Sequence, residues 1–269
     1  MKTTRTITVK QRAILTFLYR FRFASTRHIQ HYLGLVTERA ALKKLTILLD
    51  RGYIGRNYSA RDSLLGRPAS YYLTAAGIRA IKGYKRNEQG RVVPRLATDD
   101  PGIDQSVVHR IYRDPRASTR FINLCLNRAT VYTCLKRDYT THLDFRTSSD
   151  LVGWDFLPSP AASAYIRVIT RENRKARSHY FLEICDEETP FWVYKRRIRY
   201  YISYLEDGEW EGATETRMPE IVLVCTTTAL RKKLMSFIRH LVEDKYEDKI
   251  RLHTSLVVAP WLSVMPYSD

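Results

Sequence analysis

The chain has 269 residues, 44% of them hydrophobic and 12% aromatic, which is enough to build the cores of one large or two ordinary domains and excludes a disordered chain. Its net charge of +17 and pI near 9.8 predict a polyanionic partner, either nucleic acid or an anionic membrane surface. Residues 1–95 hold 20 Lys and Arg but only 4 Asp and Glu, so the basic excess belongs to the first part of the chain.

The sequence also argues against secretion and membrane insertion. It contains no run of 18 apolar residues, and the opening MKTTRTITVKQR lacks the apolar core of a signal peptide. We therefore expect a cytoplasmic protein. We expect no membrane partner either, because the basic helices lack the broad exposed apolar face that a surface-bound helix needs. The cysteines are far apart and form no C-x-x-C pair, which favours reduced, mostly buried thiols over disulfides or a zinc site. They are Cys125, Cys134, Cys185 and Cys225.

Three helices are predicted in the first fifty residues. The first covers 8–21 with Thr8 as N-cap, and the second, RHIQHYL, is capped by Ser25-Thr26 and ends at Gly34. The third starts at Thr37. Its apolar stripe, which we expect to be buried, consists of Ala41, Leu42, Leu45, Leu48 and Leu49.

Two histidines, His28 and His31, stand three apart on the second helix. This spacing suits metal ligands, but no third ligand is near, so a DNA-facing or solvent-facing role is favoured.

The segment GYIGRNYSARDSLLGRPASYYLT follows the third helix and predicts two strands joined by a basic loop with Gly66 and Pro68 in the turn. The next residues, Leu73-Thr74-Ala75-Ala76-Gly77, resemble the end of the wing in many bacterial winged-helix regulators. Helix, short helix, basic helix and β-hairpin in this order predict a winged helix-turn-helix, and hence binding to double-stranded DNA. Its outward basic helix face is Arg39, Lys43 and Lys44.

The groove geometry of such a domain divides the work between side chains. We expect Thr37, Arg39 and Lys43 to stand near base edges in the major groove. Phosphate contacts are expected from the second and third helices and from the wing loop, namely from Thr26, Arg27, Lys44, Arg61 and Arg67.

The turn-rich segment 83–103 loses periodicity and is predicted to be a linker, with residues 1–97 forming the first domain and 98–269 the second. Two helical stretches separated at Pro115 open the second domain. From residue 143 the pattern changes to three strands, a helix, a strand, a helix and a final strand. This order predicts a mixed sheet covered by helices, so the chain is of the α+β or α/β class.

The strand FLEICD and the basic helix KRRIRYY that follows it resemble segments of known protein families. The helix, hairpin, third strand and helix order looks like the core of restriction-endonuclease-like nucleases. The whole chain resembles the replication-relaxation family of mobile-element proteins, which joins a winged helix to such an α/β domain. The resemblance implies a DNA-binding protein of a plasmid, phage or integrative element, acting in its replication, transfer or transcriptional control.

The nuclease resemblance also implies acidic residues that hold Mg²⁺, together with a lysine. The nearest candidates are Asp155, Glu183, Asp186 and Lys195. The set departs from the nuclease pattern because Cys185 stands where a nuclease carries lysine, so Lys195 on the following helix would have to replace it. A structural pairing of Glu183 and Asp186 with nearby arginines competes with this reading. We therefore expect a degenerate nuclease-like domain without a cofactor, which makes protein contacts, dimerises or adds DNA contacts.

Two alternatives stay open at this point. One is a Mg²⁺-dependent DNA nuclease or nickase, and the other is an interaction protein whose basic domain meets an acidic protein instead of DNA. The basic helix also carries four tyrosines, for which packing against the sheet is favoured over stacking on unpaired bases. They are Tyr194, Tyr200, Tyr201 and Tyr204.

Overall fold

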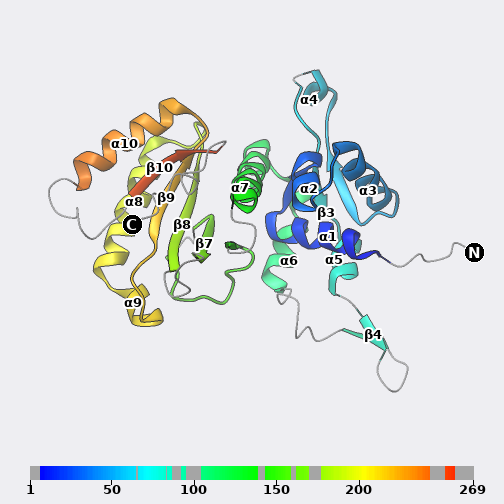
Figure 1. The fold of residues 1–269 in the computed structure, drawn as a ribbon, viewed down its shortest axis with the longest axis horizontal. Coiled ribbons are helices and arrows are strands. Elements are labelled where there is room, and N and C mark those ends of the chain that lie inside the picture. The colour runs from blue at the N-terminus through cyan, green and yellow to red at the C-terminus, as the bar shows by residue number, and fades with distance from the viewer. Residues whose placement is uncertain are drawn as a thin grey trace, which may run out of the picture. The chain divides into compact units, whose positions relative to one another are not determined.

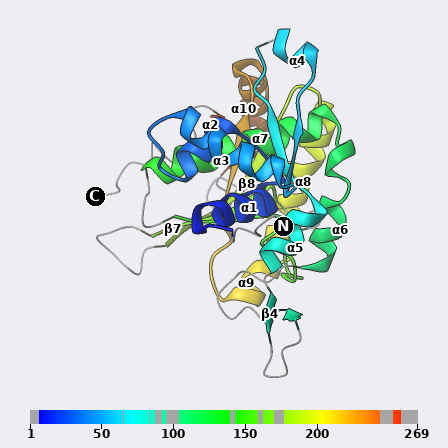
Figure 2. The same cartoon turned by 90° about the vertical axis from the view of Figure 1, so that its right-hand side faces the viewer.

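The computed structural model describes residues 7–64, 66–82, 84–86, 92–94, 104–138, 143–158, 162–169, 177–242 and 252–257. It is a mixed α and β protein, shown in Figure 1 and, turned by 90°, in Figure 2. Its contacts divide the chain into unit 1, residues 1–129, and unit 2, residues 130–269. Within the described residues no helix has both the length and the apolar character needed to cross a bilayer.

The first part of unit 1, up to Lys82, consists of five helices and a small sheet. In chain order the elements are α1 (Val9–Phe21), β1 (Phe23–Ser25), α2 (Thr26–Tyr32), α3 (Glu38–Asp50), β2 (Ile54–Asn57), α4 (Ala60–Leu64), β3 (Ser70–Leu73) and α5 (Ala75–Lys82). The strands form an antiparallel sheet in the order β1-β3-β2. As predicted, Thr8 caps α1, where Thr8 and Gln11 exchange hydrogen bonds in a capping box.

The predicted linker contains a β-hairpin. Strands β4 (Tyr84–Arg86) and β5 (Val92–Pro94) pair antiparallel, with Tyr84 opposite Pro94. The sequence did not predict this strand pair, because the segment 83–103 was interpreted as a linker from its loss of helical periodicity. The rest of this segment lies outside the described residues.

Unit 1 continues past residue 98, where the sequence suggested a boundary. Helix α6 (Gln105–Ile111), a 3-10 turn (Asp114–Arg116) containing Pro115 and the first half of α7 (Thr119–Asp138) follow the hairpin. The backbone N–H of Asp104 donates to the Tyr19 hydroxyl of α1 at 3.0 Å. Phe23 of β1 forms a hydrophobic cluster with Ile122 and Cys125 of α7. These contacts between distant segments cannot be recognised from a linker-like composition.

A buried ion pair joins two segments of unit 1 that are far apart in the sequence. The Nε of Arg22 lies 3.1 and 2.9 Å from the two carboxylate oxygens of Asp114, and its Nη2 also contacts the carboxylate and the Arg110 carbonyl. Asp114 is only 1% exposed, and burial raises its pKa against the opposing effect of Arg22. Arg22 itself has φ 72° and ψ −50°, a conformation that L-residues rarely adopt.

Unit 2 contains the second half of α7 and a five-stranded mixed sheet. Its further elements are β6 (Leu143–Thr147), β7 (Ala164–Ile169), β8 (Arg177–Cys185), α8 (Phe191–Glu206), α9 (Glu209–Thr214), β9 (Glu220–Cys225), α10 (Thr228–Val242) and β10 (Leu252–Leu256). The strand order is β10-β9-β8-β7-β6. Strands β6, β7 and β8 are antiparallel, whereas β8, β9 and β10 are parallel and are connected through α8 with α9, and through α10. The predicted mixed sheet is thus confirmed.

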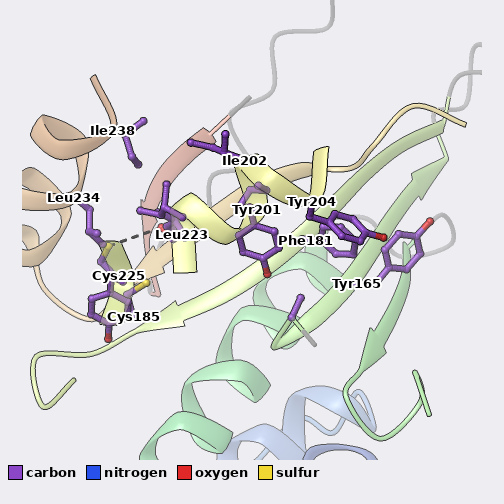
Figure 3. Packing of buried hydrophobic residues seen from close by; sticks show 14 of the residues in the cluster. Tyr165, Phe181, Cys185, Tyr201, Ile202, Tyr204, Leu223, Cys225, Leu234 and Ile238 are labelled. Carbon is purple, nitrogen blue, oxygen red and sulfur yellow. Dashed lines mark hydrogen bonds between the residues drawn. The ribbon is translucent and has the colours of Figure 1, made fainter. Parts of the chain in front are cut away.

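One face of this sheet is covered by α8 and α10 (Figure 3). Alternate residues of β8 and β9, including Phe181 and Leu223, point into the same cluster as Tyr201 of α8 and Leu234 of α10. Tyr194, Tyr201 and Tyr204 are buried there, so the packing interpretation of these tyrosines is confirmed for three of the four. Tyr200 is 37% exposed.

The cysteines behave as the sequence predicted. All four are free thiols; Cys125, Cys185 and Cys225 are buried and Cys134 is partly buried. Cys185 and Cys225 are register partners on the parallel strands β8 and β9, and hydrogen bonding to Cys225 together with burial raises the pKa of Cys185 well above its usual value.

Candidate nucleic-acid interface

The segment α2–α3 is fixed at each start by a side-chain cap. Ser25 is the N-cap of α2: its hydroxyl accepts the His28 N–H, and the His28 Nδ1 accepts the Ser25 N–H at 3.1 Å. Gly34, at φ 62°, turns the chain after α2, and the Leu35 N–H donates to the Gln30 carbonyl at 2.9 Å. Thr37 then caps α3 through the Ala40 N–H. Local capping therefore positions both helices.

The environment of His28 differs from the expected one. The side chain is buried in the capping box and does not face DNA or solvent, whereas His31 is exposed. Burial, with smaller contributions from His31 and Arg27, lowers the pKa of His28 to about 4. The imidazole is therefore neutral at physiological pH and serves as part of the structure. A cap at N3 usually comes from Glu or Gln, which is why the sequence pattern did not reveal this role.

Helix α3 has one buried and one exposed face. Ala41, Leu45 and Leu48 are buried as predicted. Leu42 is 44% exposed and Leu49 only half-buried, so the expectation of a five-residue buried stripe was wrong for Leu42. The helix packs through a narrower stripe, and Leu42 stands on the solvent side next to Lys43.

The exposed face of α3 carries the predicted base-reading side chains. Thr37, Arg39 and Lys43 are all exposed, and the i, i+4 spacing of the last two places them on one face. Lys44 is half-buried at the edge of this face. On α2, Arg27 is exposed and Thr26 half-buried. The structure thus brings five of the predicted residues onto the adjacent helices α2 and α3 and Thr37 to the turn between them.

A hairpin built from β2, α4 and β3 extends beyond the helices (Figure 2). The predicted loop holds the short helix α4, whose start is capped by mutual hydrogen bonds of Ser59 and Asp62. Arg67 is exposed, and its Nη1 lies 3.9 Å from Asp62, a loose and solvated pair worth little energy. The side chain of Arg61 lies outside the described residues, while its backbone belongs to α4.

The sequence analysis did not single out two exposed residues of the hairpin. Arg56 and Tyr58 are exposed at the end of β2, and the Arg56 guanidinium lies 5.5 Å from the centre of the Tyr58 ring. The sequence placed basic contacts only in the loop. The run Gly55-Arg56-Asn57-Tyr58 could have identified them, because a strand entering a basic hairpin loop without apolar alternation is solvated on both faces.

The base of the hairpin is locked by glycines and a threonine. A Cβ on Gly55 would lie 2.2 Å from the Tyr72 ring, its cross-strand partner, so only glycine fits beneath that ring. Thr74 accepts the Gly77 N–H at the start of α5 and donates to the Gly52 carbonyl at 2.6 Å. These contacts explain the Leu-Thr-x-x-Gly pattern physically.

The two units differ completely in net charge. Unit 1 contains 25 Lys and Arg against 8 Asp and Glu, a net charge of +17, whereas unit 2 contains 20 of each. The whole excess charge of the protein therefore belongs to the unit with α2, α3 and the hairpin. Such a field attracts polyanions at long range and is screened by salt.

In unit 2 the candidate carboxylate Glu183 sits in a dense network. Its Oε1 accepts hydrogen bonds from Arg197 Nε at 2.8 Å and Nη2 at 2.6 Å and from the Tyr201 hydroxyl, and its Oε2 accepts from Ser163 at 3.2 Å. Only 15% of its side chain is exposed. The carboxylate thus has the structural arginine partner that the sequence analysis raised as an alternative to a metal.

The other candidates of that set have their own surroundings. Asp186 accepts the Thr189 N–H and hydroxyl, both at 2.7 Å, in the turn before α8. Asp155 is exposed on the segment after β6. The Lys195 ammonium lies 5.4 Å from the centres of both the Phe191 and Phe237 rings, while Arg197 is the basic residue that contacts Glu183. Nowhere in the described parts of the chain do three or more His, Cys, Asp or Glu side chains gather as a metal site would need.

Comparison with known proteins gave no relatives from which a function could be transferred. No protein-family profile matches the chain, and neither the curated proteins nor the solved structures contain a significant match to it.

Proposed function

We propose that unit 1 is a winged helix-turn-helix that binds double-stranded DNA, with α3 in the major groove and the β2–β3 hairpin as the wing. The observation that carries the proposal is the exposed basic face of α3 next to a basic hairpin, in the unit that holds the whole net charge. The order α1-β1-α2-α3-β2-β3 and the antiparallel β1-β3-β2 sheet support the winged-helix assignment.

The exposed side chains divide into two classes. Arg39 and Lys43 project from the N-terminal half of α3, the part of a recognition helix that reads base edges, and Arg39 is the residue for bidentate contacts to guanine. Arg27 on α2 and Arg56 and Arg67 on the hairpin bind phosphates, which fix the register without reading sequence. The exposed Tyr58 ring lies 5.5 Å from the Arg56 guanidinium, so the two side chains form a cation–π pair on the wing.

The test measures binding of the whole protein to duplex DNA across a salt series. Because each neutralised phosphate contributes about 0.9 to the slope of log K against log salt, Arg67→Ala should lower the magnitude of this slope by about 1. Arg39→Ala should weaken binding to a selected site by about 1–3 kcal/mol and relax its base preference.

Arg79→Ala is the matched control for both variants, since it removes an exposed arginine from α5 of the same unit. Equal losses in Arg39→Ala and Arg79→Ala would show that only total charge matters. DNA affinity unchanged in an Arg39→Ala, Lys43→Ala double variant would overturn the proposal and favour an acidic protein as the partner.

In the cell, we propose that the protein serves a mobile genetic element in replication, transfer or transcriptional control, with unit 2 making protein or further DNA contacts. The arginine-bound state of Glu183 supports a structural use of the nuclease-like residues in unit 2. Including Mg²⁺ in the binding reactions and examining the DNA for cuts tests the nuclease alternative. Cleavage abolished by Glu183→Ala would move the function of the protein to unit 2.

A further inference from the structure

The charge of unit 2 is zero in sum but uneven in distribution. Helices α8 and α10 together contain eight Lys and Arg and a single acid, Glu206 at the end of α8. Their inner faces fill the core, where Arg197 pairs with Glu183. Five of the other basic side chains are exposed on the outer side of the helix pair, namely Arg196, Arg199, Lys232, Lys233 and Arg239. A neutral domain thus presents one strongly cationic face.

Aromatic rings lie among these cations where the two helices meet. Phe191 of α8 and Phe237 of α10 make an edge-to-face contact with ring centres 6.2 Å apart. The ammonium of Lys195 lies 5.4 Å from each ring centre, and that of Lys233 lies 4.4 Å from the centre of Phe191. The two ammonium groups are therefore at most about 10 Å apart, a distance comparable to the screening length of about 8–10 Å at 0.1–0.15 M salt. Two like charges held on one ring favour an anion between or above them.

A large aromatic surface is exposed beside this cluster. Trp192 is 59% exposed, and the Arg196 guanidinium lies 5.1 Å from the centre of its ring. An exposed tryptophan is costly to leave in water and offers the best stacking platform of any side chain. Trp192 adjoins Phe191 in the sequence, so the ring and the cationic cluster start from the same turn of α8.

We propose that this α8–α10 patch, consisting of Phe191, Trp192, Lys195, Arg196, Lys233 and Phe237, binds a single-stranded nucleic acid. Lys195 and Lys233 take successive phosphates and Trp192 stacks on an unpaired base, with Arg196 extending the platform. A duplex keeps its bases stacked inside and would use only the cations. The patch shares no residue with the duplex-binding surface of unit 1, so the two proposals stand or fall separately.

The test is fluorescence anisotropy with the full chain, using a labelled dT20 oligonucleotide, an abasic strand of the same length and a labelled duplex. Trp192→Ala should weaken binding to dT20 by about 5- to 150-fold, the effect of losing one stacked base, and leave binding to the abasic strand unchanged. Lys233→Ala should weaken binding to both dT20 and the abasic strand, and should reduce the slope of log K against log salt by about 0.7. Trp192→Ala should leave duplex binding unaffected, because a duplex offers no unpaired base for the ring to stack on. Arg217→Ala, which removes an exposed arginine of unit 2 outside these helices, is the control.

Several results would overturn the inference. If Trp192→Ala bound dT20 as tightly as the unaltered protein, Trp192 would not stack on a base. If Trp192→Ala lost the same affinity for dT20 and for the abasic strand, the patch would be a general polyanion site. If Arg39→Ala abolished dT20 binding while Lys233→Ala did not affect it, the single strand would be held by unit 1. Circular dichroism spectra identical to those of the unaltered protein show that each variant is folded.

Discussion

The Arg22–Asp114 ion pair gives the sharpest prediction about unit 1. It links the end of α1 to the turn before α7, and Asp114 is almost completely buried. Removing one partner of a buried pair leaves the other charge uncompensated, which costs about 3–5 kcal/mol. Arg22→Ala should therefore lower the free energy of unfolding of unit 1 by about this amount. Arg22→Gly should cost about 1–2 kcal/mol less, because glycine adopts the positive φ of this position without strain.

The effect also has a predicted pH dependence. Burial already raises the pKa of Asp114, and without Arg22 the opposing effect is lost and the pKa rises further. The folded variant then holds a proton that the unfolded chain has released. Its stability should therefore be greatest below the unfolded pKa of Asp and fall as pH rises through the raised pKa of Asp114.

The assay exploits the position of the tryptophans. Trp154, Trp192, Trp210 and Trp261 all belong to unit 2, so tryptophan fluorescence follows that unit while far-UV circular dichroism follows both. In urea, Arg22→Ala should shift a circular dichroism transition and leave the fluorescence transition in place. A decrease in the free energy of unfolding of less than about 1 kcal/mol would refute the reasoning. In a double-mutant cycle of Arg22→Ala and Asp114→Asn we expect a coupling energy on the order of 2 kcal/mol, and purely additive effects would refute it as well.

Three further predictions concern single sites. The pKa of His28 is about 4 in the folded protein and 6.5 in the unfolded chain. The free energy of unfolding of unit 1 should therefore fall by about 3 kcal/mol as pH is lowered from about 6.5 to about 4. Urea titrations at several pH values should show a flatter dependence in His28→Gln. Gly77→Ala places a Cβ 2.1 Å from the Tyr53 carbonyl oxygen, and should lower stability by at least about 1–3 kcal/mol; an unchanged urea midpoint would contradict the close packing of α5. Arg197→Met leaves Glu183 without its cation and should cost unit 2 about 3–5 kcal/mol, whereas the Arg197→Met, Glu183→Gln pair should recover part of this in tryptophan fluorescence melts.

Much of the local structure follows from the sequence alone. Thr8, Ser25 and Thr37 are the helix caps, and the first strand of unit 2 begins at residue 143 as predicted, because caps and alternation depend on near neighbours in the chain. The exposed Arg39 and Lys43 follow from the helical period of α3. The mixed sheet of unit 2 was predictable from the order of strands and helices.

Other features were decided by contacts between distant residues. The extent of unit 1 to residue 129 depends on Asp114 meeting Arg22, and the burial of His28 and the exposure of Leu42 depend on how α2 and α3 pack. Likewise, it is the position of Arg197 over β8 that gives Glu183 a cation, while Lys195, two residues earlier, turns to α10. Helical periodicity specifies which side chains share a face of a helix. Which neighbour covers that face depends on packing between elements, because burial and ion pairing arise between segments that are distant in the chain.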